Sequence, residues 1–242
     1  MHTDIAPPDT AATSTPQAIA PAWQTISLFL LLFGWATFGY LRTHNGGPTP
    51  TRLTTYTTTI VFQWMTTGCV VAGLYERRQT LSAFFARARL GFWRELGIGV
   101  AVLIAGLAVG GIMEALLHFT PLRNSADLQA VARILPQSNI ERAVWILISL
   151  TAGFCEEFLF RGYLQTQLIA FTRNVYAGII ISACVFGAMH IYQGAAPAIS
   201  IAALGAWLGI VAHKRKTIRS GIIAHSLQDI LGGLLRSVIK HR

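Results

Sequence analysis

Three short patterns place acidic and histidine side chains inside apolar stretches of the chain. They are Phe154-Cys-Glu-Glu-Phe-Leu-Phe-Arg161, Phe186-Gly-Ala-Met-His190 and His225-Ser-Leu-Gln-Asp229. Inserting a charged side chain at the centre of a bilayer costs roughly 2.5–3.5 kcal/mol on insertion scales, so ionisable residues in apolar segments indicate a functional site. The candidate site residues are Glu156, Glu157, His190, His225 and Asp229, supported by Arg161 and Phe186.

The first pattern separates the roles of its two glutamates. Glu157 and Arg161 are four residues apart and lie on one face of a helix, whereas Glu156 points about 100° away. Arg161 can therefore neutralise Glu157 and leave Glu156 free. In an apolar, water-poor setting a free carboxylate is a better proton acceptor, which suits a general base that takes a proton from water. The pattern predicts that Glu156 is this base.

The other two patterns supply groups that can complete the site. His225 and Asp229 are four residues apart and project from one helix face, and His190 can close a third side. In one arrangement a carboxylate activates water directly, and His225 with its neighbour donates to the developing oxyanion. In the other, His190 and His225 bind a divalent metal, for which zinc with two histidines and a carboxylate is the best match. The sequence leaves both arrangements open.

The composition indicates a membrane protein. Of the 242 residues, 53% are hydrophobic and 12% are charged, and the mean hydropathy is +0.51. The formal net charge is +9, but the basic residues form short clusters between apolar segments and not one amphipathic face. A positive-inside distribution explains these clusters better than nucleic-acid binding, which we do not expect.

Seven apolar runs are long enough, or nearly so, to cross a bilayer, which takes roughly 17–25 apolar residues. We predict an all-α, polytopic transmembrane helix bundle with about seven spanning helices, six to eight being the allowed range. The upper limit arises because the fourth run is too long for one simple crossing and can break into two helices. The runs cover residues 23–41, 56–75, 96–118, 143–171, 175–190, 195–212 and 218–239.

The chain outside these runs gives the domain organisation and the expected topology. Residues 1–22 are rich in Thr, Pro and Ala and predict a disordered tail, followed by one transmembrane domain over 23–242. No basic residue precedes the first apolar run, so this run is expected to remain as an anchor. Residues 76–95 mix arginines with large apolar side chains and predict an amphipathic surface helix. This basic segment and the one at 214–219 are expected on the same side, the cytoplasmic one, if the fourth run crosses once.

The three patterns together resemble the CAAX protease and bacteriocin-processing family, which includes the type II CAAX prenyl endopeptidases. The resemblance covers about residues 143–239, and it rests on Glu-Glu-x-x-x-Arg, Phe-x-x-x-His and His-x-x-x-Asp occurring in this order. It implies an all-helical intramembrane protease in which Glu156 activates water and Glu157 positions water or holds Arg161. It also implies that His190 orients the same water.

For the last pattern, the resemblance implies that His225 and Asp229 stabilise the oxyanion. The family takes Asn or Asp at this position, and the prenyl-protein proteases have Asn. An ionised Asp accepts hydrogen bonds but cannot donate one, so Asp229 could serve as an oxyanion donor only when protonated. As a metal ligand, or as an acceptor that fixes the ring of His225, it needs no extra proton.

The sequence therefore predicts an endopeptidase in a bilayer, specifically the inner (cell) membrane of a bacterium. Its substrate would be a membrane-associated peptide or protein, either prenylated or carrying a leader peptide. A non-catalytic role in immunity or as a membrane scaffold is the alternative from the same family. A proton-coupled transporter is a third reading, because intramembrane Glu, His and Asp also mark proton relays, but the chain shows no convincing internal repeat.

Overall fold

The computed structural model describes residues 17–44, 50–85, 91–122 and 125–239, and the regular elements in these ranges are all helical, as predicted. Most are α-helices, with one π-helical segment and one 3₁₀ turn. The elements are α1 (Ala22–His44), α2 (Arg52–Glu76), α3 (Ser82–Phe85), α4 (Phe92–Leu117), α5 (Ser125–Ile134), α6 (Asn139–Glu156), η1 (Glu157–Leu164), α7 (Gln165–Thr172), α8 (Val175–Ala188), η2 (Ile191–Gln193), α9 (Ala195–Arg215) and α10 (Arg219–Ile239).

Polar residues ahead of three helices explain where these helices begin. The Thr51 hydroxyl accepts a hydrogen bond from the Thr54 amide at the start of α2, and the Asn174 side chain caps α8 in the same way. At α6, the Ser138 hydroxyl accepts from the Glu141 amide at 3.2 Å, and the Glu141 carboxylate accepts from the Ser138 amide at 3.0 Å. Such caps satisfy amides that a helix leaves without partners in its first turn.

Each of the seven apolar runs lies within helical structure apart from at most two residues at one end, and the chain is an integral membrane protein. Among the described residues, four helical segments are long and apolar enough to cross a membrane, and the shorter α8 is also apolar. These segments are Ala22–Arg42, Phe92–Leu117, Asn139–Thr172 and Ala195–Arg215. A total of about seven spans remains a prediction, because α2, α8 and α10 are not among these segments.

The fourth apolar run does not break into two helices. Asn139 to Thr172 is one continuous helical segment, in which η1 lies between α6 and α7. A π-helix has hydrogen bonds five residues apart and forms a local widening, often at functional sites. The widening begins at Glu157, and every residue of η1 is buried. The sequence therefore placed the irregularity in the right region but gave it the wrong form.

The segment 76–95 is not one amphipathic helix in its described part, which corrects that prediction. Helix α2 extends to Glu76, and the backbone of Arg78 then takes a left-handed conformation with φ 54°. Helix α3 has only four residues, and α4 begins at Phe92. The Phe84 ring meets the Phe158 ring edge to face at 5.3 Å, so α3 packs against the core of the bundle. Residues 86–90 lie outside the described residues.

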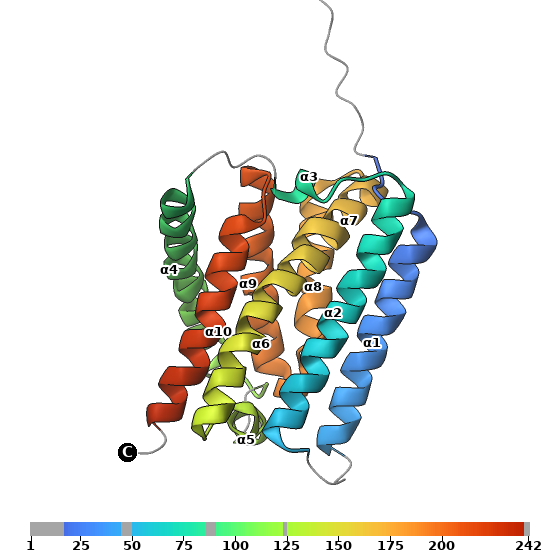
Figure 1. The fold of residues 1–242 in the computed structure, drawn as a ribbon. Helices are drawn as coiled ribbons and strands as arrows, with labels where there is room; N and C mark the ends of the chain where they lie inside the picture. The colour runs from blue at the N-terminus through green and yellow to red at the C-terminus, as the bar shows by residue number, and fades with distance from the viewer. Residues whose placement is uncertain (1–16, 45–49, 86–90, 123–124, 240–242) are drawn as a thin grey trace, which may run out of the picture.

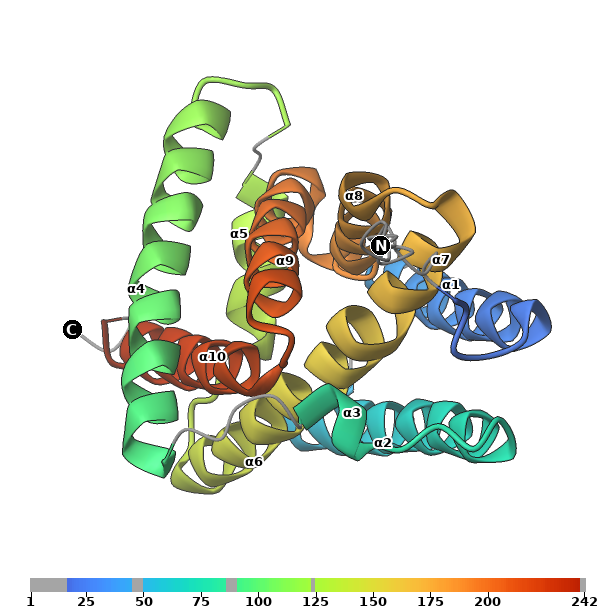
Figure 2. The same cartoon turned by 90° about the horizontal axis from the view of Figure 1, so that it is seen from above.

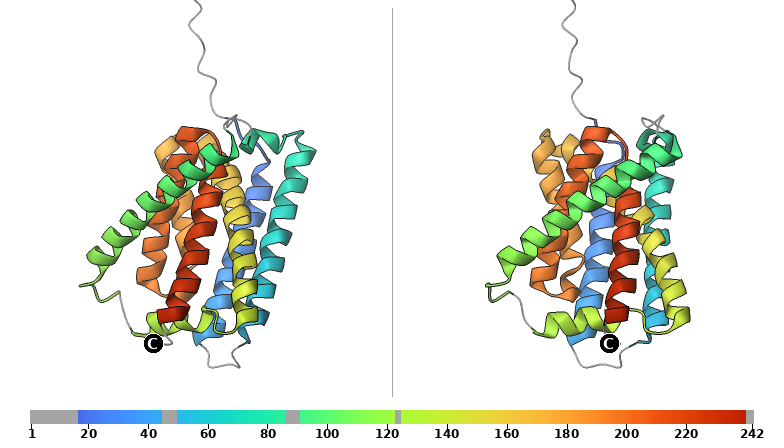
Figure 3. Two further views of the ribbon diagram at one scale, coloured as in Figure 1. Left: turned by 60° about the vertical axis from the view of Figure 1, so that its left-hand side comes forward. Right: turned by 90° about the vertical axis from the view of Figure 1, so that its left-hand side faces the viewer.

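The long α6–η1–α7 segment runs obliquely through the middle of the bundle (Figure 1). It packs against α2 on one side and against α10 and α8 on the other. Figure 2 shows the bundle from above, and Figure 3 shows α4 crossing the outside of α9 and α10 at a steep angle. The C-terminal helices thus surround η1, while α2 closes the same region from the N-terminal half.

The two basic segments lie on the same side of the bundle, as predicted. The Ile218 amide donates to the Phe84 carbonyl at 3.3 Å, which joins the loop before α10 to α3. The Arg215 guanidinium also binds Glu95 through two hydrogen bonds of 2.8 and 3.0 Å, and so ties the end of α9 to the start of α4. Figure 1 shows α3 and the start of α4 at the top of the bundle, beside the start of α10.

The predicted tail falls mostly outside the described residues, which begin at residue 17. The described part of it packs against the bundle: Ala20 is buried, and the amides of Ile19 and Ala20 donate to the Gln167 side-chain oxygen at 2.7 and 3.2 Å. Gln167 returns a hydrogen bond from its amide nitrogen to the Ala20 carbonyl. These contacts fix the approach of the chain to α1 on the same side as the two basic segments (Figure 1).

Candidate active site

A buried ion pair lies at the beginning of the π-helical segment. Arg161 Nη1 is 2.9 Å from Glu157 Oε1, and the two side chains are 2% and 0% exposed. The Arg161 guanidinium also lies over the Phe186 ring, 4.2 Å from its centre, which is a cation–π contact. The pairing of Glu157 with Arg161 has the geometry that their spacing predicts, and it neutralises the carboxylate.

His225 from α10 joins this pair. Its Nδ1 is 3.0 Å from Glu157 Oε1, so the ring donates its Nδ1 proton to the carboxylate and leaves Nε2 directed away from Glu157. Two glycines allow α10 to approach so closely. A Cβ at Gly153 would collide with Ser226, and a Cβ at Gly221 would lie 2.8 Å from Glu157 Oε2.

Glu156 lies on the other side of His225 and is less buried than its neighbour. Its Oε2 is 3.7 Å from His225 Nε2, and its Oε1 accepts a hydrogen bond of 2.8 Å from the Gln63 side-chain amide of α2. The Glu156 side chain is 16% exposed, against 0% for Glu157. The adjacent glutamates therefore occupy different environments, one sealed beside a guanidinium and the other reachable.

Asp229 lies one turn after His225 and faces the same ring nitrogen. Its Oδ2 is 3.6 Å from His225 Nε2, and its side chain is 35% exposed. Trp145 of α6 donates from its indole nitrogen to the Asp229 main-chain carbonyl at 2.9 Å, and its ring packs on Gly233. This tryptophan holds α10 in register with α6.

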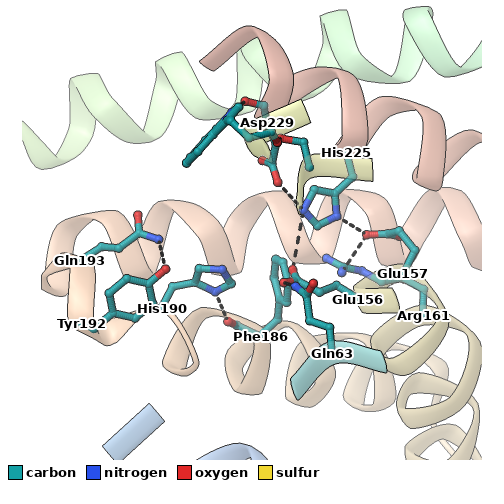
Figure 4. A network of polar contacts seen from close by, with 12 residues as sticks. Gln63, Glu156, Glu157, Arg161, Phe186, His190, Tyr192, Gln193, His225 and Asp229 are labelled. Atoms are coloured by element: carbon teal, nitrogen blue, oxygen red, sulfur yellow. Dashed lines mark hydrogen bonds and ion pairs between the residues drawn. The ribbon is translucent and has the colours of Figure 1, made fainter. Parts of the chain in front are cut away.

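His190 approaches the cluster from the end of α8 (Figure 4). Its Nδ1 is 2.9 Å from the Phe186 carbonyl, which accepts the Nδ1 proton and leaves Nε2 available. The Phe186 ring lies between the two histidines, with ring centres 5.0 Å from His190 and 5.9 Å from His225. Among the described residues, His190 makes no hydrogen bond or ion pair with Glu156 or Asp229, although the three side chains face one region in Figure 4.

The structure thus brings Glu156, Glu157, Arg161, His225 and Asp229 into one network and places His190 beside it. The residues come from three parts of the chain that are far apart in sequence, and each pattern has the helical geometry that its spacing predicts. Among the residues that the structure describes, no three His, Cys, Asp or Glu side chains are arranged to hold a metal ion. Zinc binding by His190 and His225 stays a prediction, and we derive no step through a metal.

Three residues near the site were missed in the sequence. Gln63 contacts Glu156, Trp145 contacts the backbone of Asp229, and Tyr192 stacks on His190 with ring centres 6.2 Å apart. Burial raises the pKa of Tyr192 to about 12, so its hydroxyl keeps its proton at neutral pH. Gln63 is the one with a signal in the sequence, because it is a large polar residue inside an apolar run.

The comparisons with known proteins bear on the C-terminal part of the chain. Residues 138–231 match the family model described as Type II CAAX prenyl endopeptidase Rce1-like. Comparison with the curated proteins and with solved structures finds no match. The matched range contains all three patterns and the elements from α6 into α10. This match supports membership of the CAAX protease and bacteriocin-processing family, as the three patterns predict.

Proposed function

We propose that the protein is an intramembrane endopeptidase in which Glu156 activates the water that attacks the substrate peptide bond. The family points to a peptidase. The observation that carries the mechanism is the difference between the two glutamates. Glu157 is sealed and bound by Arg161 and His225, whereas Glu156 is 16% exposed and has one oxygen facing His225 Nε2 at 3.7 Å. Of the two glutamates, Glu156 is the one that a water molecule and a substrate carbonyl can reach.

In this mechanism Glu157 is a positioning residue. By accepting the Nδ1 proton of His225, it orients the ring and directs Nε2 toward Glu156 and Asp229. Carboxylates that bind the far nitrogen of a functional histidine fix its orientation and tautomer in the same manner. Arg161 keeps the charge of Glu157 compensated where water cannot solvate it.

The reaction then follows from the placement of the groups. Glu156 takes a proton from water while the water oxygen bonds to the carbonyl carbon of the scissile peptide. The carbonyl oxygen becomes an oxyanion, to which His225, protonated on both nitrogens, donates from Nε2. When the carbon–nitrogen bond breaks, Glu156 returns its proton to the leaving amine. His190, held by the Phe186 carbonyl, uses its free nitrogen to orient the water.

Asp229 acts as an acceptor in this account and not as an oxyanion donor. One of its carboxylate oxygens faces His225 Nε2 at 3.6 Å and helps to orient the ring. This role does not require Asp229 to be protonated, and it fits the presence of Asp where the prenyl-protein proteases have Asn. The ring is thereby held between three carboxylates, with Arg161 as the only other cation that these contacts include.

The proposed substrate is a membrane-associated peptide or protein, prenylated or carrying a leader sequence, and the proposed location is the cell membrane of a bacterium. The apolar helices support this proposal, because a protein and a substrate held in the same bilayer can meet there. A bundle of about seven spans would put the basic segments on the cytoplasmic side.

The test is a cleavage assay with purified protein in liposomes, using a library of prenylated and unmodified peptides. Wild type is compared with Glu156→Ala and with a control, Glu114→Gln, which changes an exposed carboxylate on α4. We expect cleavage by wild type and the control and none by Glu156→Ala. Adding a chelator tests the zinc prediction, because activation of water by Glu156 without a metal predicts no loss of cleavage activity. Cleavage by Glu156→Ala at the wild-type rate would contradict the proposal.

A further inference from the structure

We propose that Gln63 of α2 is a positioning residue for Glu156, so that the N-terminal half of the chain completes the site. The catalytic part of this inference rests on the proposed function. Gln63 lies outside residues 138–231, the range that matches the family model, and in none of the three patterns. Its assignment comes from its place in the fold.

The geometry is that of a direct and buried contact. Gln63 Nε2 donates to Glu156 Oε1 at 2.8 Å, and Gln63 is 6% exposed. Helix α2 packs along α6, which places Gln63 opposite the end of α6 at Glu156. Figure 4 shows Gln63 reaching the carboxylate from the side opposite to His225. The two oxygens of Glu156 therefore have separate partners, the amide on Oε1 and the ring on Oε2.

The hydrogen bond from Gln63 affects how Glu156 can act as a base. A hydrogen bond from a neutral amide favours the ionised form of a carboxylate and fixes its rotamer. The other charged groups around Glu156 are Glu157 and Arg161 on η1 and His225 and Asp229 on α10, and His190 approaches from α8. Gln63 Nε2 is the nearest donor to Glu156 among the contacts of the described residues, at 2.8 Å against 3.7 Å for His225.

The side-chain oxygen of Gln63 also needs a hydrogen-bond partner. Its Oε1 is buried and has no hydrogen-bond partner among the described residues. A buried carbonyl oxygen without a donor is costly, and such an atom is commonly satisfied by water. A water molecule that donates to Gln63 Oε1 would lie next to the carboxylate that Gln63 holds.

Gln24 of α1 provides a matched control. It is also a glutamine in an apolar helix, is equally buried at 6%, and donates from its amide, but its acceptor is the Val70 main-chain carbonyl at 3.1 Å. Its contact joins α1 to α2 and does not touch a candidate catalytic residue. Gln24→Met and Gln63→Met thus each remove a side-chain amide of equal burial. The two variants differ in the acceptor that loses its hydrogen bond.

The first arm of the experiment does not need a substrate. A carbodiimide labels carboxyl groups in apolar surroundings, and peptide mass spectrometry reads the extent of labelling of Glu156 in purified protein at one neutral pH. In Gln63→Met, we expect the labelling of Glu156 to differ from that in wild type and in Gln24→Met, because the amide that occupies Oε1 is gone. Equal labelling of Glu156 in wild type and Gln63→Met would overturn the inference.

The second arm measures cleavage by the same proteins together with Glu156→Gln. We expect Gln63→Met to lower kcat at least about tenfold at nearly unchanged KM, as suits a lost hydrogen bond to a charged group. The fall in kcat should persist when the rate is divided by the amount of folded protein and should be absent in Gln24→Met, which a mere loss of folded protein would not produce. Full kcat in Gln63→Met would overturn the positioning role. Wild-type activity in Glu156→Gln would instead overturn the proposed function, and the labelling arm would still decide whether Gln63 holds Glu156.

Discussion

Glu156 and Glu157 are adjacent residues with opposite surroundings, and this contrast is the basis of the functional proposal. The spacing of Glu157 and Arg161 predicts their pairing, because residues four apart share a helix face. It could not predict the hydrogen bond from His225 to Glu157, which depends on a helix 68 residues further along the chain. The degree of burial, which distinguishes the base from the positioning residue, also arises from the packing of α10 and α2 around η1.

Replacing Glu157 should destabilise the protein far more than replacing Glu156. In Glu157→Gln the Arg161 guanidinium, 2% exposed, loses its counter-charge, and breaking a buried pair in this way costs about 3–5 kcal/mol. Thermal unfolding in detergent should show a large fall in Tm for Glu157→Gln and a small one for Glu156→Gln. The double variant Glu157→Gln/Arg161→Met should recover part of the loss. Equal Tm values for the two single variants would contradict the assigned environments.

Asp229 tests whether the last pattern acts as an acceptor. Asn at this position keeps an oxygen that can accept a hydrogen bond from His225, whereas Ala removes it. We therefore expect Asp229→Asn to retain activity within several-fold of wild type. Asp229→Ala should lose about 10²-fold or more. Steady-state cleavage of one peptide substrate measures both variants. If Asp229→Asn were as inactive as Asp229→Ala, the carboxylate itself would be required, as a metal ligand would be.

The site depends on the close packing of α6, η1 and α10 and not on residue types alone. The apolar runs predict the helices, and their polar residues predict which helices carry chemistry. The π-helical widening at Glu157 could not be predicted, because it depends on how η1 fits between α2, α8 and α10. The role of Gly221 is equally hidden in the sequence, where it is one glycine among 22.

Gly221 should be sensitive to the smallest added side chain. Its substitution by Ala would place a Cβ 2.8 Å from Glu157 Oε2, a contact that either separates α10 from η1 or turns the carboxylate away from His225. We expect Gly221→Ala to lose about 1–3 kcal/mol of stability, together with most of the cleavage activity. Gly232→Ala on the same helix has no atom within 4 Å of its Cβ and should leave both unchanged. Matching losses in the two variants would show that the effect is not one of close approach.

The whole molecule combines a C-terminal part that matches the family model with an N-terminal part that the match does not cover. The sequence predicts a helical membrane bundle and the shared side of the two basic segments, because both follow from hydropathy and charge. It does not predict that α2 supplies Gln63 or that residues 19 and 20 bind Gln167, since these contacts are between segments far apart in the chain. The N-terminal half contains none of the three patterns, but it contributes directly to the site.

The topology makes a prediction for the molecule as a whole. In a variant without Cys69, Cys155 and Cys184, single cysteines at exposed positions 79 and 214 should react with an impermeant maleimide only after the membrane is permeabilised. A cysteine at exposed position 137, before α6, should react in intact cells, because this end of the bundle lies opposite the basic segments (Figure 1). Different accessibility of positions 79 and 214 would contradict the arrangement.

The role of Glu156 as the base that activates water is tested most directly by the single-turnover cleavage rate of Glu156→Gln in ¹⁸O-enriched water, beside wild type. The amide has nearly the shape of the carboxylate and cannot take up the proton, so we expect the rate to fall by about 10²–10⁴-fold with only a small fall in Tm. Wild type should place one ¹⁸O atom in each new carboxyl terminus. A Glu156→Gln rate within a few-fold of wild type would contradict the account.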